Sequence, residues 1–518
     1  MRDGGWVAMT KDPQYAGQGL PEVLGTVFNE VCSASSSVLS LLTLLTRGAC
    51  DLIRAFGTDE LKARYCEKMF SGVWAGTMCL TEPHAGSALA DIKTIAHPEG
   101  DHYKLKGNKC FITFGDHDLT ENIVHLVLAR TPDAPEGTRG ISLFVVPKYR
   151  VDPDGSLGAL NDATVGGVEH KMGIHGSPTC VMNFGDDDDC IGHLVGELHQ
   201  GLPQMFKLMN EARMEVGQQA LGLGAAAYQA ALGYAKERVQ GKDILEKDGP
   251  NVLIVQHPDV KRNLVMMKAL VEGLRALNYA CSYYLDKSHH AADDHERQLA
   301  KGHVALLTPI CKAYSSDMAF RVTELAIQVH GGYGYIKEYG VEQYCRDVKI
   351  CSLYEGTNGI QALDLLGRKV LSRDGLLFKN YLAVIDRFIK NTEGFDDELK
   401  QLNAARDALV EVTMSLARHA GGPNARYAFL SATPYLALMS GVVAAQLLLE
   451  QAVIAQRGLE GLRGDQELET LLAQSSDAAY YHNKVLTARF FVSQILPESL
   501  AHAQAILSGD RSALELRF

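Results

Sequence analysis

The spacing of apolar residues changes twice along this chain, and this change constrains the fold more than any other feature. From residue 20 to 72 apolar residues recur at helical spacing. Between about 76 and 190 they form short runs such as Ile123–Ala129, separated by glycine and proline turns, which predict strands. Helical spacing returns from 201 to 371. The sequence therefore predicts helices, then a β-rich segment, then helices again.

Length and composition indicate a large globular protein with several domains. The 518 residues exceed what one hydrophobic core usually supports, and fractions of 46% hydrophobic and 22% charged residues are ordinary for a globular protein. The net charge of -12 argues against a general nucleic-acid binder, so we expect no nucleic-acid partner.

Neither an export signal nor a membrane span is expected. The start Met1–Trp6 lacks the apolar core of a secretory signal, and the eleven cysteines form no CxxC pair, so a cytoplasmic protein with reduced thiols is predicted. The most apolar windows, Val38–Leu45 and Tyr435–Leu449, are shorter than the ~20 residues of a spanning helix and predict buried helices. The four aspartates Asp186–Asp189 lack EF-hand spacing and predict a solvated turn, so no metal site is assigned.

A carboxylate stands between an aromatic residue and a glycine in the run Tyr354-Glu355-Gly356. Glu355 lies where a loop enters an apolar helical stretch, so a substrate could contact and desolvate it, which makes it a candidate general base. The structural alternative is that Glu355 only occupies the first turn of the following helix, where the helix dipole favours a carboxylate. Motifs upstream favour the catalytic interpretation.

Three upstream segments carry residue types suited to a large polar ligand. Gln328–Tyr335 places glycines at the end of a helical pattern, where they allow positive φ and close approach of a ligand to the backbone. Met78–Ser87 reads as a short apolar strand that runs into a turn rich in hydroxyls. Asn108–Thr113 is predicted to be a strand with Phe111 and Thr113 on one face, because side chains alternate along a strand.

In their order along the chain, these segments and the Glu355 motif resemble the acyl-CoA dehydrogenase flavoprotein family over roughly residues 5 to 370. Each motif alone is weak, and the resemblance rests on their co-occurrence. It implies a mainly α fold with a central β-domain: N-terminal helices, a small β-barrel and a four-helix bundle. It further implies FAD between the β-domain and the bundle, a homodimer or dimer of dimers in which each FAD reaches a neighbouring subunit, and an electron-transferring flavoprotein as electron acceptor.

The resemblance also assigns roles to individual residues, with Glu355 as the catalytic base. The residues that it implies for FAD binding are Met78, Leu80, Thr81, Ser87, Phe111, Thr113, Arg238, Gln328, Gly331, Gly332 and Thr357. The residues that it implies for acyl-CoA binding are Ser87, Arg213, Tyr354 and Gly356. For Arg213, whose guanidinium carries five fixed donors, an exposed helix arginine is an alternative of equal weight.

The chain departs from the family pattern at three positions. Phe111 stands where the family commonly has a tryptophan, which keeps an aromatic face but loses the indole donor. Ala88 follows Ser87 where an aspartate is usual, and Asn210 replaces the usual acid. Flavin binding is expected to survive the change at Phe111.

Residues 376 to 518 extend beyond the core family, and their helical spacing predicts an added helical domain. Together with the segment Glu169–Thr179, this extension looks like the bacterial 3-(methylthio)propanoyl-CoA dehydrogenase group. The expected domains are an N-terminal helical domain that looks truncated (1–75), the β-domain (76–195), the helical bundle with the catalytic base (196–375) and the additional helical domain (376–518).

The resemblance implies α,β-dehydrogenation of an acyl-CoA thioester, either 3-(methylthio)propanoyl-CoA or a short- or medium-chain acyl-CoA. Glu355 would remove the Cα proton while the β-hydride passes to flavin N5, and the Glu355 amide and a ribityl hydroxyl would polarise the thioester oxygen. The alternatives are a DNA-associated flavoprotein, a catalytically silent assembly partner and an acyl-CoA oxidase. The first needs a basic C-terminal surface, but residues 376 to 518 are slightly acidic. The intact Glu355 argues against a silent assembly partner. Whether the protein is an oxidase depends on the access of oxygen to the flavin.

Overall fold

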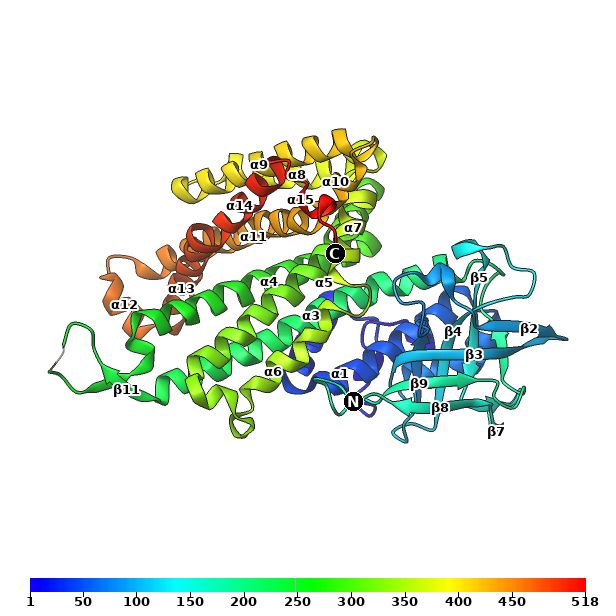
Figure 1. Cartoon of the computed structure of the whole chain (residues 1–518). Helices are drawn as coiled ribbons and strands as arrows, with labels where there is room; N and C mark the ends of the chain where they lie inside the picture. Colours follow the sequence, from blue (N-terminus) through cyan, green and yellow to red (C-terminus); the bar gives the residue numbers. More distant parts are fainter. Residues whose placement is uncertain (247) are drawn as a thin grey trace. The chain divides into compact units, whose positions relative to one another are not determined.

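A computed structural model of the chain describes residues 1–246 and 248–518 and contains two compact units, Met1–Glu215 and Val216–Phe518 (Figure 1). The first unit combines helices with a β-domain, and the described residues of the second unit form helices and one short hairpin. Helix α3 (Gly201–Glu237) contributes its first turns to the first unit and its remainder to the second.

The first unit begins with helices α1 (Glu22–Phe56) and α2 (Asp59–Phe70). Thr58 caps the start of α2, because its side chain accepts a hydrogen bond from the N–H of Leu61 at 3.3 Å. Helix α1 is kinked at Ser36, whose φ of -160° and ψ of 96° are not helical.

The β-domain follows, and its strand pairing closes on itself. Strands run in the order β1-β4-β5-β10-β3-β9-β8, and β2 pairs with both β3 and β4, so β4, β5, β10, β3 and β2 form a closed ring. The strands are β1 (Trp74–Cys79), β2 (Ile95–Glu99), β3 (His102–Thr113), β4 (Asn122–Arg130), β5 (Ile141–Pro147), β6 (Tyr149–Val151), β7 (Leu157–Leu160), β8 (Ala163–Val168), β9 (Thr179–Phe184) and β10 (Ile191–Leu194).

Strand β4 shows why this domain reads as continuously apolar. Its side chains alternate between two cores, so that Leu126 and Leu128 pack with residues of α1 and α2 while Val127 and Ala129 pack inside the β-domain with Phe144. Both faces of the strand are therefore buried, and neither needs polar residues.

The second unit is a large helical assembly whose helices form one packed body. Helix α4 starts with Pro258 at its first position, and α5 ends at His330 with Gly331 as its C-cap, whose φ is 62°. The helices are α4 (Pro258–His290), α5 (Asp294–His330), α6 (Val341–Val348), α7 (Asn358–Leu363), α8 (Leu376–Asn391), α9 (Asp396–Ala420), α10 (Ala425–Leu430), α11 (Ala432–Arg463), α12 (Leu468–Gln474), α13 (Ser476–Phe490), α14 (Leu496–Leu507) and α15 (Ser512–Glu515), and the hairpin strands are β11 (Val239–Lys242) and β12 (Asn251–Leu253).

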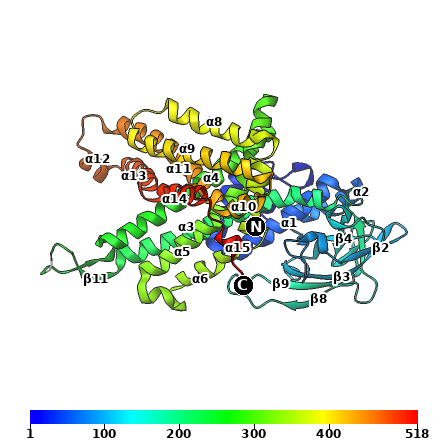
Figure 2. The same cartoon turned by 45° about the horizontal axis from the view of Figure 1, so that its top comes forward.

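The C-terminal extension packs directly on the helices that precede it. In Figure 1 α11 lies between α9 and α4, and α11 and α13 both contact α4. Figure 2 shows the same helices from a second direction. Lys484 of α13 forms an ion pair with Glu272 of α4 at 3.1 Å, and Arg321 of α5 pairs with Glu498 of α14 at 3.0 Å. The predicted helical character of residues 376 to 518 is confirmed.

Within residues 1–246 and 248–518, α1 and α11 are long and apolar enough to cross a membrane by length and composition alone. The helices have 35 and 32 residues, so both are longer than the apolar windows in the sequence that predicted them. Most residues of their apolar windows are buried against other elements of the fold, as in core helices. The prediction of buried helices in these two regions is confirmed.

Candidate active site

The Glu355 loop connects the short 3-10 turn Lys349–Ser352 to helix α7. Glu355 has a φ of 55° and Gly356 a φ of 84°, so two successive residues occupy the left-handed region. For glutamate this conformation costs of the order of 1 kcal/mol or more, and such strain concentrates at functional sites. The cap of α7 is Thr357, which accepts from the N–H of Ile360 at 3.4 Å, so Glu355 precedes the helix and the first-turn alternative is wrong.

Polar residues of two helices hold this loop. On one side the Tyr354 hydroxyl donates to Oε1 of Gln219 in α3. Burial raises the pKa of Tyr354 well above its usual value, with Cys351 and Glu355 adding to the shift, so the phenol remains a donor. On the other side Nδ2 of Asn358 donates to Oδ1 of Asp317 in α5 at 2.7 Å.

A pocket of about 730 Å³ lies in the second unit, between the end of α3, the β11–β12 hairpin and the end of α5. This volume falls within the ~300–1,000 Å³ typical of small-molecule sites. The predicted residues Arg238, Gln328, Gly331 and Gly332 are brought together in its wall. The full lining is Tyr234, Arg238, Gln240, Gly241, Ile254, His257, Val260, Gln328, Val329, His330, Gly331, Gly332, Tyr333 and Ile336.

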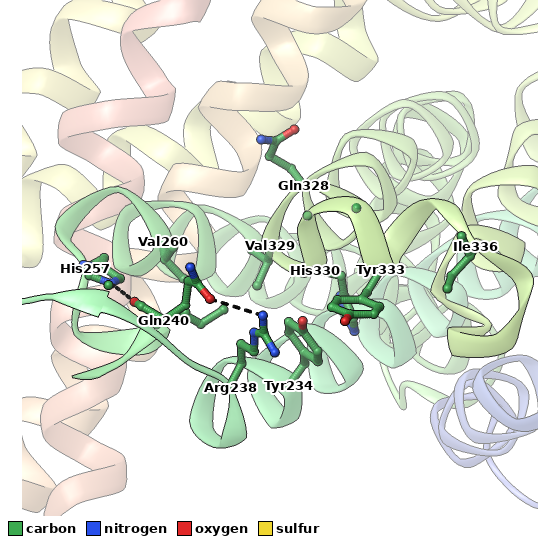
Figure 3. A pocket seen from close by; sticks show the side chains of 14 residues that line it. Tyr234, Arg238, Gln240, His257, Val260, Gln328, Val329, His330, Tyr333 and Ile336 are labelled. Atoms are coloured by element: carbon green, nitrogen blue, oxygen red, sulfur yellow. Dashed lines mark hydrogen bonds between the residues drawn. The ribbon is translucent and has the colours of Figure 1, made fainter. Parts of the chain in front are cut away.

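Arg238 is the cationic group of this wall and is flanked by aromatic rings (Figure 3). Its guanidinium lies over the ring of Tyr333 at 5.5 Å and donates to Oε1 of Gln240 at 3.2 Å. Tyr234 and His330 stack beside it with centroids 4.3 Å apart. The Gln328 amide points away from this cluster (Figure 3).

The glycines at the end of α5 leave space for a ligand. A Cβ added at Gly331 or Gly332 would meet no atom within 4 Å, whereas one at Gly334 would lie 2.5 Å from the carbonyl oxygen of Ile327. Gly334 is therefore required by packing. At Gly331 and Gly332 the backbone faces open space, and a ligand can approach the main chain closely.

In the β-domain, the two predicted flavin segments lie side by side. The N–H of Cys110 donates to the carbonyl oxygen of Thr81 at 2.9 Å, and Nζ of Lys109 donates to the carbonyl oxygen of Leu80 at 3.1 Å. Lys109 also pairs with Glu82 at 2.8 Å, and both side chains are fully buried. The sequence motifs 78–87 and 108–113 are thus joined by a buried ion pair.

Glu82 is the centre of a dense hydrogen-bond network. Its carboxylate also accepts from the Thr94 hydroxyl at 2.6 Å and from the N–H of Lys93 at 2.7 Å. Burial opposes ionisation, but the Lys109 ammonium and these donors outweigh it and hold the pKa of Glu82 below its usual value. The network fixes the turn that carries Leu80 and Thr81.

The remaining predicted residues lie in the first unit. Met78 and Thr113 are half-buried and Ser87 is exposed. The alternation predicted for side chains along β3 does not hold at Phe111, because the strand register shifts between Lys109 and Ile112. Phe111 has a φ of 60° and is 64% exposed.

Arg213 lies in the first turns of α3, within the first unit. Only 3% of it is exposed, and its Nη1 donates to Oδ1 of Asn210 at 3.5 Å. The alternative of an exposed helix arginine is therefore wrong.

The supporting residues Gln219, Asn358, Gln361, Glu82 and Lys109 were missed by sequence reasoning. A signal existed for two of them, because Asn358 and Gln361 are three residues apart just after the Glu355 motif and share one face of a helix. The others are brought to the loops only by folding.

The chain thus combines a closed β-domain, helices before and after it, a strained glutamate loop and a pocket of small-molecule size. Four family models match the chain. They are "Acyl-CoA dehydrogenase, N-terminal domain" (1–73), "middle domain" (77–186), "C-terminal domain" (199–371) and "Acetyl-CoA dehydrogenase C-terminal like" (381–517). The chain belongs to the acyl-CoA dehydrogenase family and is an FAD-dependent enzyme of that family.

Individual relatives agree with this assignment. A butyryl-CoA dehydrogenase of Syntrophomonas wolfei is 41% identical, with 97% of this chain and 83% of the relative covered. A 3-methylmercaptopropionyl-CoA dehydrogenase of Ruegeria pomeroyi is 40% identical, with 98% and 84% covered. The crystal structure of a Bacillus anthracis acyl-CoA dehydrogenase complexed with FAD shares the fold, with a TM-score of 0.78, 21% identity and 98% and 82% covered. The predicted family and fold class are confirmed.

Proposed function

We propose that Glu355 is the base that removes the α-proton of a short, linear acyl-CoA. The observation that carries this proposal is the left-handed conformation of Glu355, which the fold maintains with hydrogen bonds on both flanks of the loop. A carboxylate fixed in this way can meet the Cα–H bond of a bound thioester without a reorganisation cost. The flanking Tyr354 and Gly356 are then the residues that contact substrate at the reacting carbons.

The residues of the chain fit FAD. Arg238 supplies a cation beside open backbone at Gly331 and Gly332, which suits the phosphates of a dinucleotide. We assign Arg238, Gln328, Gly331, Gly332 and Thr357 to cofactor binding in the second unit. In the first unit we assign the set Met78, Leu80, Thr81, Ser87, Phe111 and Thr113. FAD, when bound, supplies the acceptor for the hydride equivalent from Cβ.

The substrate proposal follows from the two relatives named above. One acts on butyryl-CoA and the other on 3-methylmercaptopropionyl-CoA by name, and both acyl groups are short and unbranched. We assign Arg213 and Ser87 to substrate binding as well, since a buried guanidinium can hold a carbonyl or phosphate of acyl-CoA.

The assembly and partners proposed here follow the family. A homodimer or dimer of dimers would let the Arg238 pocket serve the FAD of a neighbouring subunit, and an electron-transferring flavoprotein would reoxidise the enzyme. The same proposal places the protein in the cytoplasm without a membrane span. It divides the chain into four domains, 1–75, 76–195, 196–375 and 376–518.

Anaerobic flavin bleaching tests the substrate class. The FAD-loaded protein is mixed with butyryl-CoA, 3-methylmercaptopropionyl-CoA, palmitoyl-CoA and a branched isovaleryl-CoA while flavin absorbance is followed. We expect fast bleaching by the first two and slow bleaching by the others. Fast bleaching by palmitoyl-CoA or isovaleryl-CoA alone would contradict the substrate class but not the base.

A further inference from the structure

Gln361 is a fully buried glutamine whose amide points back at the Glu355 loop. Its Nε2 donates to the carbonyl oxygen of Glu355 at 3.2 Å and to that of Gly356 at 3.1 Å. Both hydrogens of the amide are used, and the exposed fraction of the residue is 0%. Gln361 lies in helix α7, and the two carbonyls lie in the loop that precedes the helix.

A capping role for α7 does not explain these bonds. The side-chain cap of the helix is Thr357, whose hydroxyl accepts from the N–H of Ile360. Gln361 donates instead to carbonyl groups upstream of the cap, and these groups belong to the two residues with left-handed backbone. Its side chain therefore acts on the loop and not on the helix.

The consequence for Glu355 follows from where the backbone is anchored. On the N-terminal side, Tyr354 is held by its hydroxyl on Gln219 and by its N–H on the carbonyl oxygen of Ile350 at 3.1 Å. On the C-terminal side, Gln361 holds the two peptide groups after Glu355. The φ and ψ of Glu355 lie between these anchors, so they cannot relax to the right-handed region without breaking one of them.

We propose that Gln361 is a positioning residue for the dehydrogenation: its amide clamps the Glu355 and Gly356 carbonyls and so holds Glu355 in the left-handed conformation that aims the carboxylate at the substrate. The inference rests on the proposed role of Glu355 as base. Without the clamp, Glu355 regains a choice of backbone conformations, and a misplacement of about 1 Å can slow a reaction about 10²-fold.

The test compares Gln361→Met, which removes the amide at similar volume, with the parent enzyme loaded with FAD. Rapid anaerobic mixing with butyryl-CoA gives the limiting rate of flavin reduction and the concentration for half-saturation. We expect a limiting rate lower by about 10- to 100-fold with half-saturation changed less than threefold. A purely structural role would lower the melting temperature and leave the limiting rate at the parental value, and that result would overturn the inference.

A matched control and a second variant keep the test decisive. Gln446→Met removes another buried glutamine of the same unit, which bonds Tyr381 and Glu450, and is expected to lower stability while leaving the limiting rate unchanged. Gln361→Glu keeps the shape but offers at most one donor, and only when it is protonated. Its limiting rate should therefore fall at high pH more steeply than that of the parent, and a parental pH profile would overturn the inference if Gln361→Met failed to fold.

Failure of the clamp and failure of the base give different results. If Glu355→Gln reduces flavin slowly while the Gln361 variants reduce it at the parental rate, the clamp is wrong and the base stands. If Glu355→Gln reduces flavin at the parental rate, the base lies elsewhere and the clamp has no catalytic target.

Discussion

Glu355 and Arg238 illustrate two ways in which single residues are made functional here. Glu355 gains its position from backbone conformation, since a left-handed φ sends its side chain in a direction that a helical or extended residue could not. Arg238 gains its position from neighbours, since Tyr333 stacks on the guanidinium and Gln240 accepts from it. A lysine could not reproduce this planar arrangement.

Arg238→Met is therefore expected to weaken FAD binding. Loss of the cation removes the charge that would pair with the cofactor phosphates, and contacts of this kind contribute about 1.5–3 kcal/mol, or about 10- to 100-fold in Kd. Quenching of flavin fluorescence on titration into apoprotein measures the Kd. Arg418→Met, a change at an exposed arginine of α9, should leave it unaltered, and an unchanged Kd in Arg238→Met would refute the assignment.

At the scale of elements, the strands of the β-domain carry buried polar groups that the loops depend on. Lys109 of β3 and Glu82 of the turn after β1 form a fully buried ion pair. His125 of β4 is also buried and bonds the Thr77 hydroxyl of β1 through Nδ1 at 2.7 Å. Burial lowers the pKa of His125 to about 4, so the ring is neutral in the folded protein at pH 7.

Lys109→Met should destabilise the protein strongly, because it leaves the Glu82 carboxylate buried without its cation. The expected loss is about 3–5 kcal/mol of unfolding free energy, together with weaker FAD retention as the turn at Leu80 loosens. The double variant Lys109→Met, Glu82→Gln should recover most of the loss. Urea unfolding measures both, and equal stabilities of the single and double variants would argue against a charge effect.

His125 should make stability depend on pH in mildly acidic solution. Because its pKa is lowered from 6.5 to about 4 on folding, the unfolded chain binds more protons between these values. As the pH falls from 6.5 toward 4, the unfolding free energy therefore decreases by up to about 3 kcal/mol. Above pH 6.5 His125 is neutral in both states and causes no such loss. Chemical unfolding of His125→Gln should show a smaller decrease in unfolding free energy between pH 7 and 4.5 than the parent shows. An identical decrease would mean that His125 does not cause the pH dependence.

At the scale of the whole molecule, the C-terminal extension is part of the second unit's core. Leu448 of α11 and Phe491 lie within 3.5 Å of where a Cβ at Gly273 of α4 would stand, so the helices approach closely. The ion pair of Lys484 with Glu272 joins α13 to the same helix, α4. The extension thus stabilises the bundle that carries the Glu355 loop.

A chain ending at residue 375 is expected to fold poorly, because removal of α11 and α13 exposes the apolar face of α4 to water. The measurement is the yield of FAD-loaded protein in size-exclusion chromatography, followed by a thermal melt. A truncated chain with parental flavin content and melting temperature would show that the extension is independent of the bundle.

The sequence was most informative where one local rule decides the structure. The strand predicted at Ile123–Ala129 is β4, because buried apolar runs between turn residues have few other solutions. The end of α5 at Gly331 was similarly readable from its glycines.

Long-range contacts were beyond a single sequence. Gln219 and Tyr354 are 135 residues apart, and Lys109 and Glu82 are 27 residues apart, so no local pattern predicts either pair. The bulge at Phe111 also escaped prediction, because nothing in a run of β-forming residues announces a positive φ at phenylalanine.

The most direct test of the central claim is flavin reduction in Glu355→Gln. The substitution keeps the shape of the side chain and removes the proton acceptor, so FAD and butyryl-CoA should still bind while reduction slows by at least the ~10²–10⁴-fold typical of general-base loss. Glu469→Gln, at an exposed position in α12, serves as the control and should reduce flavin at the parental rate. Anaerobic rapid mixing at saturating substrate gives the rate. A parental rate in Glu355→Gln, with a substrate that bleaches the parent, would show that Glu355 is not the base.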